Sequence, residues 1–269
     1  MPDPARPLAF ILASTDHGAM IVNRFDQHVL GDRAYGVGYQ LLSKASYDPE
    51  EVSLLLKLLD VRRKHYGDGV VAVDCGANLG VHTVEWAKHM TSWGVVLAFE
   101  AQERIYYALA GNLALNNCFN ARAVNAAVSR QSGTMKIPQP NYLKNASFGS
   151  IELTKREGGE FVGQTIDYSE DKMIEIRMVH LDAFNLPRLD LLKIDVEGME
   201  LDVLDGASRC IDERRPILLV ELVKTDANAL RGWLENRGYS VYPSGLNYIA
   251  FHKDDKCLES ITITTPAAA

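Results

Sequence analysis

Residues 74–80 place an acid and two glycines in an order that suits a positively charged ligand. The segment reads Asp-Cys-Gly-Ala-Asn-Leu-Gly and follows an apolar run, residues 70–74, that is typical of a buried strand. Gly76 and Gly80 let the backbone approach a ligand closely, and a helix that begins near Val81 offers unpaired N–H groups. A dinucleotide site has G-x-G-x-x-G here, which makes room for an anionic pyrophosphate. Asp74 instead favours a cation.

Glu100 supplies a second acid at the end of the next predicted strand, residues 95–100. A carboxylate at this point of a nucleotide-binding sheet can accept hydrogen bonds from both ribose hydroxyls. S-adenosylmethionine carries a sulfonium, an ammonium and a ribose, so the pair of acids predicts this cofactor. The alternative is that Asp74 only caps the following helix and Glu100 only ends a strand. Near the end of the third strand, Asn125 and Ala126 would border the adenine. The residues expected to bind the cofactor are Asp74, Gly76, Ala77, Asn78, Gly80, Glu100, Ala101, Asn125 and Ala126.

A lysine and three further acids lie at the ends of the fourth and fifth predicted strands. Lys193, Asp195 and Glu197 point to one side for as long as the chain stays extended, and Glu221 ends the neighbouring strand. A buried lysine needs a carboxylate partner, for which Asp74, Asp195 and Glu221 are the candidates. The three carboxylates of this group are also oxygen ligands of the kind that magnesium or calcium uses, but no metal-loop motif is present and we expect no metal.

Methyl transfer to a hydroxyl requires in-line approach of the oxygen and removal of its proton. Asp195, Glu197, Glu221 and His82, which is in the first turn of the helix after the glycine loop, could each act as the general base, and Glu197 is the first candidate. Asn145 and Ser147 lie in a loop that we expect to contact the acceptor, with Tyr35 and Tyr39 as a wall. The predicted catalytic residues are Glu197, Asp195, Glu221, Lys193 and His82.

Three motifs together resemble the FkbM family of class I S-adenosylmethionine-dependent methyltransferases. They are D-x-G-A-N-x-G at 74–80, L-L-K-I-D-V-E-G-M-E at 191–200 and V-L-x-G-A at 203–207. The resemblance covers about residues 51–251 and implies methylation of a hydroxyl oxygen of a sugar, a polyketide or another small metabolite. One departure is that family members often have proline after the acid of the second strand, whereas Ala101 and Gln102 follow Glu100 here.

The elements that position these residues alternate regularly from residue 70 onward. Apolar runs of strand length occur at 70–74, 95–100, 123–128, 189–195 and 217–221, and stretches of helical period follow most of them. Asp226 can cap a helix that ends at Gly238, and residues 239–242 and 248–252 then form a hairpin. This pattern predicts an α/β, doubly wound, Rossmann-like class I methyltransferase fold with a mostly parallel sheet and a C-terminal antiparallel hairpin.

Two segments lie outside this alternation. Residues 1–47 form an N-terminal extension with small β-structure expected at 20–29 and 35–41, and residues 48–269 form the methyltransferase domain. That domain opens with a helix from Asp48, whose leucines at 54, 55, 58 and 59 should pack on the sheet. Residues 130–180 are a β-rich insertion between the third and fourth strands, and insertions at one end of a sheet usually carry function.

Composition limits the partners and the compartment. The 269 residues are 47% hydrophobic and 23% charged with a net charge of −7, which excludes disorder as the main theme and argues against nucleic acid or an anionic membrane. The apolar run at 8–13 is too short to span a bilayer, so we expect a cytoplasmic protein. Four widely spaced cysteines predict buried, reduced thiols and no zinc site. The expected partner is a small hydroxylated acceptor, and the sequence does not decide whether the chain forms a homodimer.

Two alternatives to an O-methyltransferase remain at this stage. An NAD(P)-dependent oxidoreductase on a Rossmann-type sheet would keep the role of Glu100. The glycine motif of such enzymes, G-x-G-x-x-G, is absent from this sequence. A non-catalytic module that binds S-adenosylmethionine would keep the cofactor site and not depend on the acids of the fourth strand.

Overall fold

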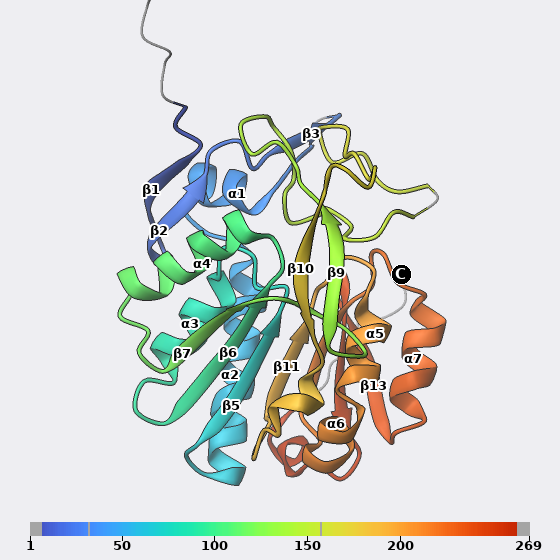
Figure 1. Cartoon of the computed structure of the whole chain (residues 1–269). Helices are drawn as coiled ribbons and strands as arrows, with labels where there is room; N and C mark the ends of the chain where they lie inside the picture. The colour runs from blue at the N-terminus through green and yellow to red at the C-terminus, as the bar shows by residue number, and fades with distance from the viewer. Residues whose placement is uncertain (1–6, 32, 157, 263–269) are drawn as a thin grey trace, which may run out of the picture.

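Seven strands form a central sheet in the order β13-β14-β12-β11-β5-β6-β7 (Figure 1). The computed structural model describes residues 7–31, 33–156 and 158–262. Neighbouring strands from β12 to β7 are parallel, and β14 is antiparallel to both β12 and β13, so the mostly parallel sheet with a C-terminal hairpin is confirmed. The strands are β5 Val70–Cys75, β6 Gly94–Glu100, β7 Ala121–Asn125, β11 Leu191–Ile194, β12 Ile217–Glu221, β13 Tyr239–Ser244 and β14 Asn247–His252.

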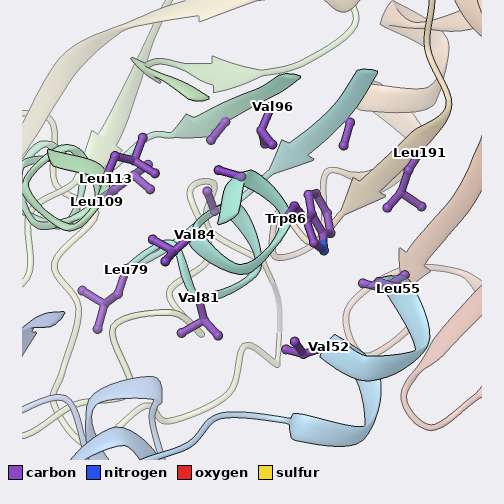
Figure 2. Close-up of a cluster of buried hydrophobic side chains, with 14 of the residues drawn as sticks. Val52, Leu55, Leu79, Val81, Val84, Trp86, Val96, Leu109, Leu113 and Leu191 are labelled. Atoms are coloured by element: carbon purple, nitrogen blue, oxygen red, sulfur yellow. The ribbon is translucent and has the colours of Figure 1, made fainter. Parts of the chain in front are cut away.

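The central strands are apolar along their length because helices cover both faces of the sheet. In β5, Val70 and Ala72 join one hydrophobic cluster and Val73 and Cys75 join another on the opposite face. Figure 2 shows the first cluster, where α2, α3 and α4 bring Leu55, Trp86 and Leu109 together; α5, α6 and α7 pack into the second. The helices are α2 Pro49–Tyr66, α3 Val81–His89, α4 Glu103–Leu115, α5 Glu200–Gly206, α6 Ser208–Arg214 and α7 Ala227–Glu235.

Helix boundaries follow local signals. Pro49 begins α2, and Leu55, Leu58 and Leu59 of its predicted stripe are buried in the core while Leu54 is half-buried. The Asp226 side chain accepts the N–H groups of Asn228 and Ala229 and caps α7, which ends at Glu235. Within the described residues, α2 is the longest helix, and none is both long and apolar enough to cross a bilayer. All four cysteines are buried and free.

The extension contains two hairpins and a helix. Strands β1 Phe10–Thr15 and β2 Gly18–Asn23 pair, as do β3 His28–Leu30 and β4 Arg33–Tyr35, and α1 Val37–Lys44 follows. The predicted strand at 35–41 is therefore wrong beyond Tyr35. Asp26 accepts the N–H of Gly38 at 2.8 Å in the first turn of α1, a cap from a distant segment that the local pattern does not contain. Because Met20 and Val22 belong to the same core as α4, the described extension packs on the main fold; the domain boundary at 47/48 stays a prediction.

The insertion adds a second sheet. Strands β8 Ala127–Val128, β10 Met173–Val179 and β9 Gly133–Pro138 pair in that order, so the β-rich insertion is confirmed. The predicted third strand at 123–128 is divided, because the chain leaves the main sheet after β7 and β8 pairs with β10 instead. Figure 1 shows the loops of the insertion beside the extension at one end of the molecule, and a bridge between Asp26 and Ala146 joins the two segments.

Candidate active site

A cavity of about 830 Å³ lies at the carboxyl ends of the parallel strands, a size typical of ligand pockets. The ends of β6, β11 and β12, the loop after β5, the start of α2, the insertion and the turn of the β13–β14 hairpin all line it. The neighbours of β5 are β6 on one side and β11 on the other, so the order in which successive strands are added to the sheet reverses at β5. The cavity is thus at the topological switch point, where ligands bind in open α/β sheets.

The loop between β5 and α3, residues 76–80, is the glycine loop, and it lines part of the cavity. Gly76, Ala77 and Asn78 line the cavity, whereas Gly80 does not. A Cβ on Gly76 would lie 1.7 Å from the Asp195 carbonyl oxygen, and its φ is +81°, so glycine is required by the close approach of the chain after β11. Gly80, with φ +85°, precedes α3 as its N-cap residue.

Glu100 lines the cavity and holds the loops on either side of it. One carboxylate oxygen accepts the N–H of Asn78 at 3.0 Å and the other accepts the N–H of Gln102 at 2.8 Å. Burial raises the pKa of Glu100 to about 7, although the two N–H groups act in the opposite direction. Because a carboxylate oxygen has two lone pairs, each oxygen keeps one acceptor position for a ligand.

Asp74 does not line the cavity, and its place beside the cofactor stays a prediction. Its side chain is only 1% exposed. One oxygen accepts the Thr83 hydroxyl at 2.7 Å, and the other lies 3.7 Å from Lys193 Nζ. The strand continues to Cys75, so the carboxylate lies beneath the loop and supports α3 and the lysine.

Lys193 is held by two of its three candidate partners. Its Nζ donates to Asp195 at 3.0 Å and lies 3.7 Å from Asp74. Burial disfavours the charged lysine, but Asp195 and Asp74 outweigh burial and hold the pKa of Lys193 well above its usual range. Lys193 and Asp195 both line the cavity, so the ion pair forms part of its wall.

Three acids converge as the strand pattern predicted. Oxygen atoms of Asp195, Glu197 and Glu221 lie within 4.8 Å of one another. The backbone that carries Glu197 is not extended as expected, because β11 ends at Ile194 and Glu197 has a left-handed φ of +59°. Burial, followed by repulsion from Asp195, raises the pKa values of Glu197 and Glu221. Burial thus favours the protonated form of these two carboxyls, while Lys224 favours the ionised form of Glu197.

Two residues that sequence reasoning missed hold this cluster. Glu200 is fully buried and accepts the N–H groups of Val196 at 3.2 Å and Gly198 at 3.0 Å, which fixes the turn that carries Glu197. In the sequence, Glu200 was indicated by its place in the motif at 191–200. Lys224 forms an ion pair with Glu197 and donates to the Ser150 carbonyl at 2.6 Å, so it connects the cluster to the insertion. No sequence motif marked Lys224.

His82 lines the cavity, and its partner was also not anticipated. Its Nε2 lies 3.1 Å from Oε1 of Glu51, which is in the first turn of α2. An acid in the first turn is ordinary for a helix, since it suits the helix dipole, so the local pattern did not assign Glu51 to the site. His82 and Glu51 bring α3 and α2 together at the cavity wall.

The remaining predicted residues divide between the cavity and its surroundings. Ala101, Ala126 and Ser147 line the cavity. Asn125 does not, because its amide donates to the carbonyls of Glu100 at 2.8 Å and Ala101 at 3.1 Å. Its contact with adenine stays a prediction.

The loop at 145–150 and the two tyrosines contribute less than expected. Asn145 is exposed and does not line the cavity. Its contact with the acceptor stays a prediction. Tyr35 lines the cavity, but Tyr39 does not.

Comparison with known proteins gives matches over most of this site. The model of the Methyltransferase FkbM domain matches residues 74–241. Methyltransferase 1 of Beauveria bassiana is 26% identical over 189 residues, which are 65% of this chain and 74% of that protein. Methyltransferase sdnD of Sordaria araneosa is 30% identical over 154 residues, 50% of this chain and 59% of that protein.

Solved structures of methyltransferases also align with the chain. A methyltransferase FkbM from Methylobacillus flagellatus shares 18% identity with a TM-score of 0.45, over 69% of this chain and 43% of that one. An S-adenosylmethionine-dependent O-methyltransferase from Thermotoga maritima shares 12% identity with a TM-score of 0.40, over 93% and 94% of the two chains.

Proposed function

Because this chain belongs to the FkbM family of S-adenosylmethionine-dependent methyltransferases, we propose that it methylates a hydroxyl oxygen of a small metabolite such as a sugar or a polyketide. One observation carries the proposal: Glu100 and the glycine loop border the same cavity as three converging carboxylates. Groups that suit a nucleoside and groups that suit hydroxyls would thus share one cavity.

The cavity residues fit S-adenosylmethionine, the cofactor that the family implies. Glu100 keeps an acceptor position on each oxygen, which suits two ribose hydroxyls. The loop of Gly76 to Asn78 would hold the methionine end, and the small side chains of Ala101 and Ala126 leave room for adenine. Asp195, which lines the cavity where Asp74 does not, would supply the negative charge that a sulfonium favours.

The bound cofactor supplies an electrophilic methyl group on a positively charged sulfur. The chain's own task is to bring the acceptor oxygen into line with that group, and positioning of this kind contributes about 7–11 kcal/mol in favourable cases. Asp195, Glu197 and Glu221 would bind hydroxyls of the acceptor and hold its oxygen in place. The proton of the reacting hydroxyl passes to a group in this wall, for which Glu197 and His82 are the candidates.

Oxygen is favoured over nitrogen as the acceptor because the wall is rich in groups that accept hydroxyl protons. A neutral amine already carries a free lone pair and needs no base for the transfer itself. The other two alternatives, an oxidoreductase and a non-catalytic module, are set aside because the family is one of methyltransferases.

Calorimetry and mass spectrometry test the proposal. We expect S-adenosylhomocysteine to bind and NAD not to bind, and binding of NAD alone would overturn the cofactor assignment. The enzyme is then incubated with S-adenosylmethionine and three probes: methyl glucopyranoside, a hydroxylated aromatic polyketide and glucosamine. A product heavier by one methylene, with the methyl group on oxygen, supports the proposal. Methylation confined to the glucosamine nitrogen would contradict it.

A further inference from the structure

His82, Glu51 and Asn247 form a chain of polar side chains at the cavity wall. His82 Nε2 lies 3.1 Å from Glu51 Oε1, and the other oxygen of Glu51 accepts a hydrogen bond from Asn247 Nδ2 at 2.6 Å. The three residues come from α3, α2 and β14, and all of them line the cavity. A base oriented by a carboxylate, which is itself oriented by a further group, is the arrangement found around catalytic histidines.

Aromatic rings restrict the imidazole. The His82 ring lies edge-on to Tyr47, with 6.4 Å between centroids and an interplanar angle of 89°, and it is tilted against Trp86 at 5.8 Å. The residue is only 6% exposed. Although Nε2 and Glu51 Oε1 are 3.1 Å apart, their geometry falls outside that of a hydrogen bond, and catalytic pairs often align only when a substrate binds. Packing therefore sets the plane of the ring, and Glu51 selects which nitrogen faces it.

Glu51 is suited to select the tautomer because it is ionised. Burial raises its pKa, but His82, Lys193 and Asn247 outweigh burial and lower the pKa of Glu51. An ionised carboxylate only accepts hydrogen bonds, so the ring nitrogen facing it must carry the proton. Nε2 is then protonated, and Nδ1 keeps a lone pair for a substrate.

The neighbouring acids are less suited to accept a proton. Burial and repulsion from Asp195 raise the pKa values of Glu197 and Glu221, and Glu197 is already engaged by Lys224. Asp195 is already engaged by Lys193, whose Nζ lies 3.0 Å from its carboxylate. Imidazole, in contrast, exchanges a proton near neutral pH.

The charged groups that face His82 come from the start of α2 and from β11. Asp48, the N-cap residue of α2, and Glu51, in its first turn, place negative charge beside the ring. Lys193, in β11, acts on Glu51 from the other side. Tyr47 and Trp86 contribute uncharged rings.

Resting on the proposed function, we infer that His82 is the general base of the transfer and that Glu51 and Asn247 are positioning residues that fix its tautomer. The acceptor oxygen bonds to the methyl carbon while the carbon–sulfur bond breaks and leaves its electron pair on sulfur. The hydroxyl proton passes to His82 Nδ1. The positive charge thus moves from sulfur to the imidazolium beside Glu51, and the proton later leaves to solvent.

The chain provides a matched control for this pair. Asp60 and His89 also join α2 to α3, with 2.7 Å between Oδ1 and Nε2, but their side chains are 57% and 30% exposed and neither lines the cavity. If the carboxylate–histidine pairs only tied the two helices together, both would behave alike. A catalytic role belongs to the cavity pair alone.

Kinetics of four variants test the assignment with whichever probe the wild type methylates. His82→Gln should lower kcat by about 10²–10⁴-fold, the usual contribution of a general base, and leave the affinity for S-adenosylhomocysteine unchanged. Glu51→Gln should lower kcat less and alter the pH profile, in which the wild-type rate falls as acid protonates the base. Asp60→Asn and His89→Gln should leave kcat and the profile unchanged. Wild-type kcat in His82→Gln would overturn the inference.

A second measurement needs no acceptor. Heteronuclear NMR of labelled imidazole nitrogens distinguishes the two tautomers, and comparison with His82→Gln assigns the signals. We expect the Nε2–H tautomer in the wild type and its loss in Glu51→Gln. The Nδ1–H tautomer in the wild type would refute the inference. This result stands even if no probe is methylated or S-adenosylhomocysteine fails to bind, outcomes that count against the proposed function instead.

Discussion

Removing the Lys193 ammonium should destabilise this fold far more than removing an exposed ion pair. Lys193 Nζ is 3.0 Å from Asp195 and 3.7 Å from Asp74. The Asp195 side chain is 31% exposed and can be hydrated when the lysine is lost, but that of Asp74 is 1% exposed. In Lys193→Met, Asp74 would keep only its bond from Thr83 and would become a buried charge without a counter-ion.

The expected magnitude follows from that buried charge. Breaking a buried pair by removing one partner costs about 3–5 kcal/mol. Each kcal/mol lowers Tm by about 2–4 °C in a chain of this size, so Lys193→Met should lower Tm by about 6–20 °C. Adding Asp74→Asn removes the orphaned charge, so the double variant should recover much of the lost stability.

Thermal and urea unfolding, followed by circular dichroism, measure these changes. The control is Arg63→Met, which breaks the 2.7 Å ion pair between Arg63 and Asp68. Because these side chains are 44% and 65% exposed, the substitution should lower the free energy of unfolding by less than about 1 kcal/mol. The reasoning is refuted if Lys193→Met is as stable as this control, or if the double variant is no more stable than Lys193→Met.

Three further predictions concern single residues. Because burial raises the pKa of Glu100 to about 7, binding of S-adenosylhomocysteine should strengthen as rising pH ionises it, and calorimetry should show no such slope in Glu100→Gln. Burial raises the pKa of Asp26 from 3.8 to about 6, so its contribution to the free energy of unfolding is complete below 3.8 and lost as pH rises through 6. Urea midpoints should lose this pH dependence in Asp26→Asn, and an unchanged dependence would exclude Asp26 as its source. Gly76→Ala should lose several kcal/mol in denaturant unfolding, because the new Cβ would lie 1.7 Å from the Asp195 carbonyl; wild-type stability would contradict the geometry.

The sequence pattern alone predicted the sheet and the convergence of its acids. Apolar runs of strand length separated by helical periods specify buried parallel strands, because each run must be apolar on both faces. Acids that follow such runs must meet at one edge, since parallel strands end on the same side. Asp195, Glu197 and Glu221 accordingly lie together, although the segment that carries Glu197 is a turn and not a strand.

Local pattern did not decide which acid faces the cavity. Asp74 and Asp195 each stand near the end of a buried strand, yet only Asp195 lines the cavity. The difference depends on where each strand ends, since β5 continues past Asp74 and β11 stops before Asp195. A single residue of strand length reverses the direction of a side chain.

Only the tertiary structure supplied the partners that set the chemistry of each site residue. Glu51 reaches His82 from another helix, Lys224 reaches Glu197 from another loop, and Asp26 caps α1 from a separate segment. Short-range physics encodes the periodic burial of strands and helices, the glycine turn and the order of the acids along the chain, and these could be predicted from the amino-acid pattern. Protonation states and orientations are set by burial and by charges that packing brings together from distant segments, and no local spacing contains that information.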